Sequence, residues 1–168
     1  MSDTFVAILM GSDSDFPVME SCIEILKKFD IRFEVKVSSA HRTPEATHNY
    51  VKDADARGCS VFICAAGMAA HLAGAVSANT LKPVLGVPIN SSLDGLDALL
   101  ATVQMPAGIP VGTVAIGKAG AKNAAYLAAQ IIGTSDPVVH KALIAERQAN
   151  AEAVMAKDAA LQEKLKSL

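Results

Sequence analysis

The sequence predicts an α/β domain in which helices cover both faces of a five-stranded, doubly wound parallel sheet. Short runs rich in β-branched residues alternate with longer segments of helical periodicity up to Gly133. This alternation favours parallel strands joined by right-handed helical crossovers. Of the 168 residues, 51% are hydrophobic but only 4% are aromatic. Small aliphatic side chains must therefore build the core, which suits close packing of helices on a parallel sheet.

Five strands are expected where apolar residues form runs too short for a buried helix. They are Phe5 to Met10, Phe33 to Val37, Val61 to Ala65, Val84 to Val87 and Val111 to Ile116. In the second run, apolar residues alternate with charged ones. This alternation predicts a strand less buried than the first.

Helices are expected between these strands, where apolar residues recur at helical spacing. They are Pro17 to Phe29, Thr43 to Gly58, His71 to Thr80, Leu96 to Val103 and Ala119 to Ile132. A further helix is expected to begin with Asp136 as its N-cap and Pro137 at its first position. No strand follows it, so we expect this C-terminal helix to pack on the core or on a neighbouring subunit. Residues 1–168 then form a single domain.

Charge and cysteine content exclude several classes of protein. The formal net charge of −2 provides no broad basic surface for nucleic acid or membranes. The three cysteines (Cys22, Cys59 and Cys64) lack zinc-site spacing, so we expect free thiols in a reducing cytosol and no metal site. No basic leader is present, and no apolar run approaches the roughly 20 residues of a membrane span. We therefore expect a cytoplasmic protein.

Ligands of open α/β sheets bind beyond the carboxyl ends of the strands. Residues 11–15, 38–44, 66–72 and 90–92 follow the first four expected strands. Together these segments carry small hydroxyl side chains, an aspartate, an arginine and two histidines. Such a set is typical of a site for a phosphorylated small molecule.

The segment from Gly11 to Asp15 leads into a helix start, where backbone N–H groups and the helix dipole favour an anion. Ser12 and Ser14 add hydroxyl donors, although no P-loop motif is present. The alternative is an ordinary capped turn, with Asp15 as the N-cap before Pro17.

The segment after the second strand combines a cation with a titratable ring. Arg42 can hold a phosphate through two parallel hydrogen bonds. His41 is a candidate general acid and base, because imidazole exchanges protons near neutral pH. The alternative is that Thr43 caps a helix starting at Pro44, with His41 and Arg42 solvated in the loop.

The segment from Ala66 to Leu72 is almost free of polar side chains apart from His71. Small residues allow a ligand to approach the backbone closely. A dry pocket would suit a carbamate that loses carbon dioxide, because desolvation destabilises its charged carboxylate. The alternative is tight helix–sheet packing with His71 as a satisfied core residue or an N-terminal helix residue. We expect His48 and His140 at the surface.

Six strings of residues, in their order and spacing, carry a resemblance to a known family. They are MGSDSD (10–15), SSAHRTP (38–44), AAHLAG (69–74), LGVPI (85–89), VQMPAGIPVGTVAIGKAGAKNA (103–124) and LAAQI (127–131). From Val6 to about Gly133, the chain resembles the catalytic subunit of phosphoribosylaminoimidazole carboxylase. The AAHLAG string resembles the bacterial branch of that family, the 5-(carboxyamino)imidazole ribonucleotide mutases.

The resemblance implies a three-layer, flavodoxin-like fold and an isomerase of de novo purine (IMP) biosynthesis. The reaction would convert a carbamate to 5-amino-1-(5-phosphoribosyl)imidazole-4-carboxylate by decarboxylation and recarboxylation at ring carbon 4. The resemblance implies no cofactor and no metal. It also implies a homo-octamer with active sites at subunit contacts, where the loop of Gln104, Met105 and Pro106 helps to cover the site.

Carried over residue by residue, the resemblance makes His41 the general acid and base and His71 the second histidine of the pocket. The remaining residues would bind the ribonucleotide, with the serines and Arg42 on the phosphate and Asp15 on the ribose. They are Ser12, Ser14, Asp15, Ser39, Arg42, Ala66, Gly67 and Leu72. Three positions depart from the family pattern: Asp13 stands where lysine is common, Met68 where glycine is usual, and Ala73 where proline is usual.

Two other functions fit parts of the same sequence. One is direct carboxylation of aminoimidazole ribonucleotide by carbon dioxide, the reaction of the family's second branch. The other is a non-catalytic, flavodoxin-like module that holds a nucleotide or flavin. The scarcity of aromatic residues and the neighbouring His41 and Arg42 argue against the binding module.

Overall fold

Five parallel strands form one sheet in the computed structural model, which describes residues 4–168. Their order across the sheet is β2-β1-β3-β4-β5, and every pair of neighbours is parallel. The strands are β1 (Phe5–Met10), β2 (Phe33–Val37), β3 (Cys59–Gly67), β4 (Val84–Ile89) and β5 (Gly112–Thr113). The order changes direction at β1, as the predicted doubly wound sheet requires, so the predicted fold class is confirmed.

The register of the strands brings their carboxyl ends to one edge of the sheet. Met10, the last residue of β1, is level with Val37 in β2 and Ala65 in β3. Gly67 at the end of β3 is level with Ile89 at the end of β4. The four loops that leave these ends therefore start side by side.

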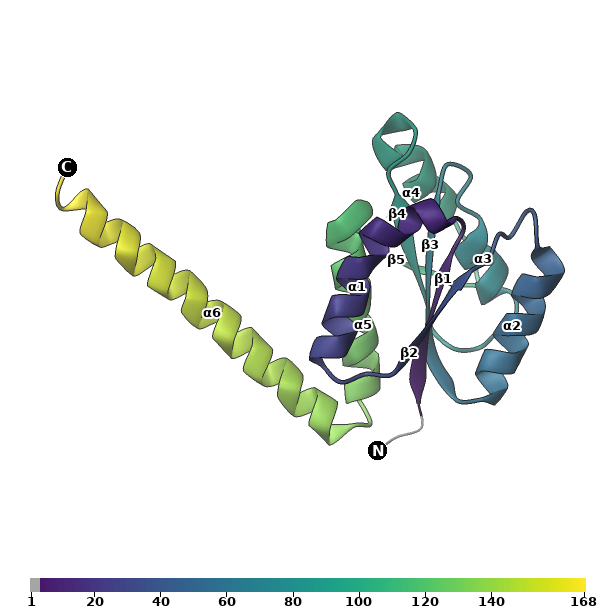
Figure 1. Cartoon of the computed structure of the whole chain (residues 1–168), viewed down its shortest axis with the longest axis horizontal. Coiled ribbons are helices and arrows are strands. Elements are labelled where there is room, and N and C mark those ends of the chain that lie inside the picture. Colours follow the sequence, from purple (N-terminus) through teal and green to yellow (C-terminus); the bar gives the residue numbers. More distant parts are fainter. Residues whose placement is uncertain (1–3) are drawn as a thin grey trace.

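Helices cover both faces of the sheet (Figure 1). Helices α1 and α5 lie on one face, and α2, α3 and α4 lie on the other. Their bounds are α1 (Phe16–Lys28), α2 (Pro44–Ala56), α3 (Leu72–Ser77), α4 (Leu96–Val103) and α5 (Gly117–Gly133). Two short 3-10 turns, η1 (Asp13–Asp15) and η2 (Leu93–Gly95), precede α1 and α4.

Side chains along strand β1 point alternately to the two faces of the sheet and so divide the core into two parts. Val6, Ile8 and Met10 pack towards α1 and α5, whereas the intervening Phe5, Ala7 and Leu9 pack towards α2 and α3. All six side chains are buried. Strand β2 lies at the edge and is only partly buried, as its alternating pattern predicted.

Helix α6 (Pro137–Leu165) begins where it was predicted. The Asp136 carboxylate accepts hydrogen bonds from the backbone N–H groups of Val138 and Val139, at 2.9 and 3.2 Å. The first turns pack on α5, and Glu146 pairs with Lys28 of α1 at 2.5 Å. From Arg147 onward every residue is exposed, and the helix extends away from the sheet (Figure 1). None of the helices in residues 4–168 has the length and apolar character needed to cross a membrane.

Strand β5 and helix α3 are much shorter than predicted. Strand β5 was expected from Val111 to Ile116, but it pairs only with β4 and through only two register positions. The apolar residues on either side of it, Val111 and Val114, pack against the two cores instead of joining the ladder. Helix α3 ends at Ser77 rather than Thr80, where the N–H of Asn79 turns back to the carbonyl of Val76.

Candidate active site

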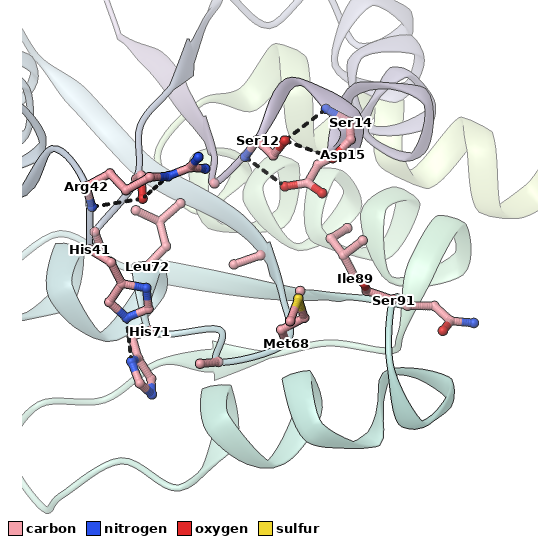
Figure 2. A pocket seen from close by; sticks show the side chains of 17 residues that line it. Ser12, Ser14, Asp15, His41, Arg42, Met68, His71, Leu72, Ile89 and Ser91 are labelled. Carbon is pink, nitrogen blue, oxygen red and sulfur yellow. Dashed lines mark hydrogen bonds between the residues drawn. The ribbon is translucent and has the colours of Figure 1, made fainter.

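A cavity of about 730 Å³ opens at the carboxyl edge of the sheet, between the loops that follow β1, β2, β3 and β4 (Figure 2). Every sequence-predicted site residue lines it. The lining residues are Gly11, Ser12, Ser14, Asp15, Ser39, Ala40, His41, Arg42, Ala66, Gly67, Met68, Ala69, His71, Leu72, Ile89, Asn90 and Ser91. The cavity therefore combines a polar wall with an apolar one.

The first segment is fixed by a capping box at Ser12. Its hydroxyl accepts hydrogen bonds from the N–H of Ser14 at 3.2 Å and from the Ser14 hydroxyl at 2.8 Å. Its own N–H donates to the Asp15 carboxylate at 3.1 Å. Asp15 occupies the N-cap position of α1, as the alternative predicted, but its side chain makes no cap hydrogen bond to that helix. Its carboxylate turns back to Ser12 instead.

Asp15 is the buried acid of the cavity, with 6% of its surface exposed. Burial raises the pKa of Asp15 above its ordinary value, and the hydrogen bond from the Ser12 N–H opposes that rise. The nearby charge of Asp13 raises the pKa of Asp15 further. A poorly hydrated carboxylate of this kind is a strong acceptor for hydroxyl groups of a ligand.

The second segment orients Arg42 across the mouth of the cavity. The Ser39 hydroxyl accepts hydrogen bonds from the backbone N–H of Arg42 at 3.1 Å and from its Nε at 3.5 Å. The two terminal nitrogens of the guanidinium have no partner among residues 4–168 and are free to bind an anion.

The side chain of Thr43 closes this loop rather than capping α2. Its hydroxyl accepts from the N–H of Ser39 at 3.1 Å and donates to the carbonyl of Ser39 at 3.0 Å. Thr43 also occupies the N-cap position of α2, with Pro44 first in the helix as that alternative predicted, but its hydroxyl makes no cap hydrogen bond to the helix. The short cycle between Ser39 and Thr43 holds His41 and Arg42 at the loop's apex.

The two predicted histidines meet at the edge of the cavity (Figure 2). Nε2 of His41 lies 2.8 Å from Nδ1 of His71, and the rings are nearly perpendicular at 88°. His41 comes from the loop before α2, and His71 occupies the N-cap position of α3. One proton bridges the two nitrogens, because a proton on each would force them apart. His71 is exposed, so it is not a core residue, but it lies at the N-terminus of α3, as the second form of the alternative predicted.

A tight turn places His71 at this position. The N–H of Ala70 donates to the carbonyl of Met68 at 2.9 Å, and the N–H of His71 donates to that of Ala69 at 2.8 Å. At Gly67 the backbone lies against β4, since a Cβ there would lie 3.3 Å from the Ile89 carbonyl oxygen. A side chain there would require β4 to shift by a few tenths of an ångström, so the close approach favours glycine at this position.

Several lining residues were not among those predicted to bind a ligand. Ala40 and Ile89 had no chemical signal in the sequence, because an isolated small or aliphatic residue does not distinguish a pocket wall from the core. Asn90 and Ser91 lay in a segment that was recognised from its place after β4. A search of residues 4–168 finds no group of three or more His, Cys, Asp or Glu side chains that could hold a metal.

Three other sequence-predicted features lie outside the cavity. His48 and His140 are exposed, as expected, and Nδ1 of His48 lies 2.6 Å from Oδ1 of Asn79. The loop that contains Gln104 and Met105 does not line the cavity of its own chain. Instead, the sulfur of Met105 packs against Gly74 of α3.

Comparison with known proteins identifies the family. The family model described as AIR carboxylase matches residues 5–153. The chain belongs to the AIR carboxylase family. The family predicted from the six sequence strings is thereby confirmed.

Curated relatives in this family come from bacteria and archaea. One from Mycobacterium tuberculosis (strain H37Rv), named N5-carboxyaminoimidazole ribonucleotide mutase, is 52% identical over 158 residues, covering 94% of this chain and 90% of that protein. One of the same name from Methanocaldococcus jannaschii is 48% identical over 161 residues, covering 96% and 99%. Among solved structures, Treponema denticola PurE superposes with a TM-score of 0.86 at 31% identity, covering 94% of this chain and 98% of that one. The AIR carboxylase fold is therefore shared over nearly the whole chain.

Proposed function

We propose that this chain is a 5-(carboxyamino)imidazole ribonucleotide mutase, an isomerase of purine biosynthesis. The observation that carries the proposal is the contact of His41 with His71 beside a cavity that also holds Arg42 and Asp15. The name shared by curated relatives at about half sequence identity supports it. The substrate is a ribonucleotide whose exocyclic amine carries a carbamate.

The polar wall of the cavity binds the ribose phosphate. The free terminal nitrogens of Arg42 pair with two phosphate oxygens, and the hydroxyls of Ser12, Ser14 and Ser39 add hydrogen bonds. The buried Asp15 carboxylate accepts hydrogen bonds from the ribose hydroxyls.

The reaction begins at the carbamate nitrogen. As the N–C bond breaks, its electron pair stays on nitrogen, and protonated His41 donates a proton there. Carbon dioxide and a neutral amine result. Nδ1 of His71 accepts the Nε2–H of His41, which leaves Nδ1 of His41 for the substrate.

Recarboxylation follows on the apolar wall formed by Ala66, Gly67, Ala69 and Leu72. Ring carbon 4, which is enamine-like, attacks the carbon dioxide. Neutral His41 then removes the proton from that carbon and restores the aromatic ring. No net proton, electron or cofactor is consumed. A positioned acid and base contributes about 10²–10⁴-fold to such a rate, and confinement of the gas supplies a proximity effect.

We also propose that the chain works as a cytoplasmic homo-octamer. Support comes from the part of α6 beyond Arg147, which leaves Val154, Met155, Leu161 and Leu165 exposed. A second copy that covers these residues would give this half of the helix a packing partner, and the Gln104 loop could then reach a neighbour's cavity. Light scattering of the purified chain measures the mass, and a monomer at micromolar concentration would contradict the octamer.

One assay separates the mutase from its alternatives. The purified chain is supplied either with the carbamate substrate or with aminoimidazole ribonucleotide and bicarbonate, and formation of the 4-carboxylate is followed by absorbance. A mutase consumes the carbamate efficiently without added bicarbonate. Preferential consumption of the amine with bicarbonate would instead identify a direct carboxylase, and no turnover of either would identify a binding module.

A further inference from the structure

One long side chain interrupts the wall of small residues in the cavity. Residues 65–70 read Ala, Ala, Gly, Met, Ala, Ala, so Met68 is the single large residue of this segment. Its φ of +54° lies in the left-handed region, which disfavours any residue with a Cβ. Three other non-glycine residues in 4–168 share a positive φ, namely Asp30, Leu93 and Asp94, and none of them lines the cavity.

Strain of this kind persists where the surrounding structure or the function requires it. The conformation belongs to the turn between β3 and α3, in which the N–H of Ala70 donates to the carbonyl of Met68 and after which His71 contacts His41. The turn does not require a large side chain, since glycine adopts the same φ without strain. The thioether at Met68 therefore needs a separate explanation.

The position of the side chain supplies that explanation. In Figure 2, Met68 lies between the histidine pair and Ile89, across the cavity from Arg42. It is 58% exposed although it lines a cavity, so its surface is available to a bound molecule. A side chain at the neighbouring Gly67 would fit tightly, because its Cβ would lie 3.3 Å from the Ile89 carbonyl oxygen and 3.4 Å from Cβ of Ser91. Met68 is therefore the residue of this segment that supplies a long apolar side chain to the wall.

We propose that Met68 is a water-excluding cover that retains carbon dioxide beside ring carbon 4, an inference that rests on the proposed mutase reaction. Methionine suits this role because it is unbranched, flexible and apolar, so it can follow the substrate as the carboxyl group moves. Its effect is on the fate of the gas, not on the cleavage that releases it.

This role has a measurable signature. After the N–C bond breaks and His41 protonates the nitrogen, the carbon dioxide is either captured by ring carbon 4 or lost to solvent. Loss leaves aminoimidazole ribonucleotide, which the proposed enzyme does not turn over efficiently. The ratio of this amine to the 4-carboxylate therefore reports retention directly.

The test compares Met68→Gly with Met68→Leu, using carbamate substrate labelled with ¹³C in its carboxyl group. Glycine removes both the strain and the cover, whereas leucine keeps an apolar side chain of similar size. We expect Met68→Gly to raise the fraction released as amine by about tenfold, since a covering apolar side chain is removed. Its melting temperature should stay the same or rise by about 2–4 °C. Met68→Leu should stay close to the wild-type ratio.

An unchanged ratio in Met68→Gly, with normal conversion by the wild-type chain, would overturn the role of Met68 and leave the mutase intact. A raised ratio together with a melting temperature several degrees lower would also overturn it, because general loosening would then explain the leak. If the wild-type chain fails to convert the carbamate, the proposed function fails first, and this inference falls with it.

Discussion

Replacing His71 tests whether the histidine pair acts as a unit. The perturbation is His71→Leu, which removes the acceptor 2.8 Å from Nε2 of His41 while keeping an apolar side chain of comparable size. Protonated His41 carries a hydrogen on both nitrogens, so Nε2–H loses its partner in this variant. Because His71 is exposed, its replacement should change the free energy of unfolding by no more than about 0.5 kcal/mol.

The size of the effect follows from the contact. A hydrogen bond to a charged group contributes about 1.5–3 kcal/mol. Both rings are exposed, which places this bond at the lower end of that range. Each 1.36 kcal/mol corresponds to a factor of ten in rate, so we expect kcat of His71→Leu to fall by about tenfold to thirtyfold. KM should change by less than about threefold, because the phosphate and ribose groups lie on other loops.

A matched variant separates hydrogen bonding from packing. The side-chain oxygen of asparagine occupies nearly the position of Nδ1 in histidine, so His71→Asn can still accept from His41. Steady-state assays with the carbamate should show kcat of His71→Asn within about threefold of wild type, as expected when the hydrogen bond is retained. Equal losses in both variants, or no loss in His71→Leu, would refute the reasoning.

Three further predictions concern the ligand wall and the core. Arg42→Leu should raise KM for the carbamate by about 10- to 100-fold, because charged hydrogen bonds to the phosphate are lost. A change in KM below about threefold in steady-state kinetics would exclude Arg42 from the phosphate site. Burial raises the pKa of Asp15, so the native state binds this proton more tightly than the unfolded chain does. Protonated Asp15 therefore contributes to the free energy of unfolding at low pH, and this contribution is lost as pH rises through the raised pKa. Urea titrations should therefore show Asp15→Asn to be more stable than wild type at pH 7 but not at pH 3. Its KM should rise about tenfold. An equal difference in stability between the two proteins at both pH values would contradict this. Burial raises the pKa of Cys22 to about 12 and that of Cys59 to about 11. A thiol reagent at pH 8 should therefore react with these two cysteines only as the chain unfolds. Rapid modification of the folded protein would contradict this expectation.

The sequence predicted most of the fold because strand and helix periods were clear. Buried runs such as Phe5 to Met10 and alternating runs such as Phe33 to Val37 separate central from edge strands without any knowledge of the partner strands. Strand β5 was overestimated because apolar residues after Thr113 look the same whether they pair in a ladder or pack against helices. The ends of a strand depend on its neighbour, which no local pattern records.

The site was predicted in outline because the carboxyl ends of parallel strands must gather at one edge. Two contacts still lay outside sequence reasoning. The pairing of His41 with His71 depends on the turn at Met68, whose positive φ no local pattern signals. The return of Thr43 to Ser39 depends on loop geometry, because a threonine before Pro44 is equally compatible with a helix cap.

The central claim is that one imidazole first gives a proton to the substrate nitrogen and then takes a proton from ring carbon 4. The most direct measurement is single-turnover conversion of the carbamate by excess His41→Asn, with calorimetric binding of the 4-carboxylate as the control. Our account predicts binding within about threefold of wild type and conversion slowed by at least about 10²-fold. Conversion at nearly the wild-type rate would contradict it.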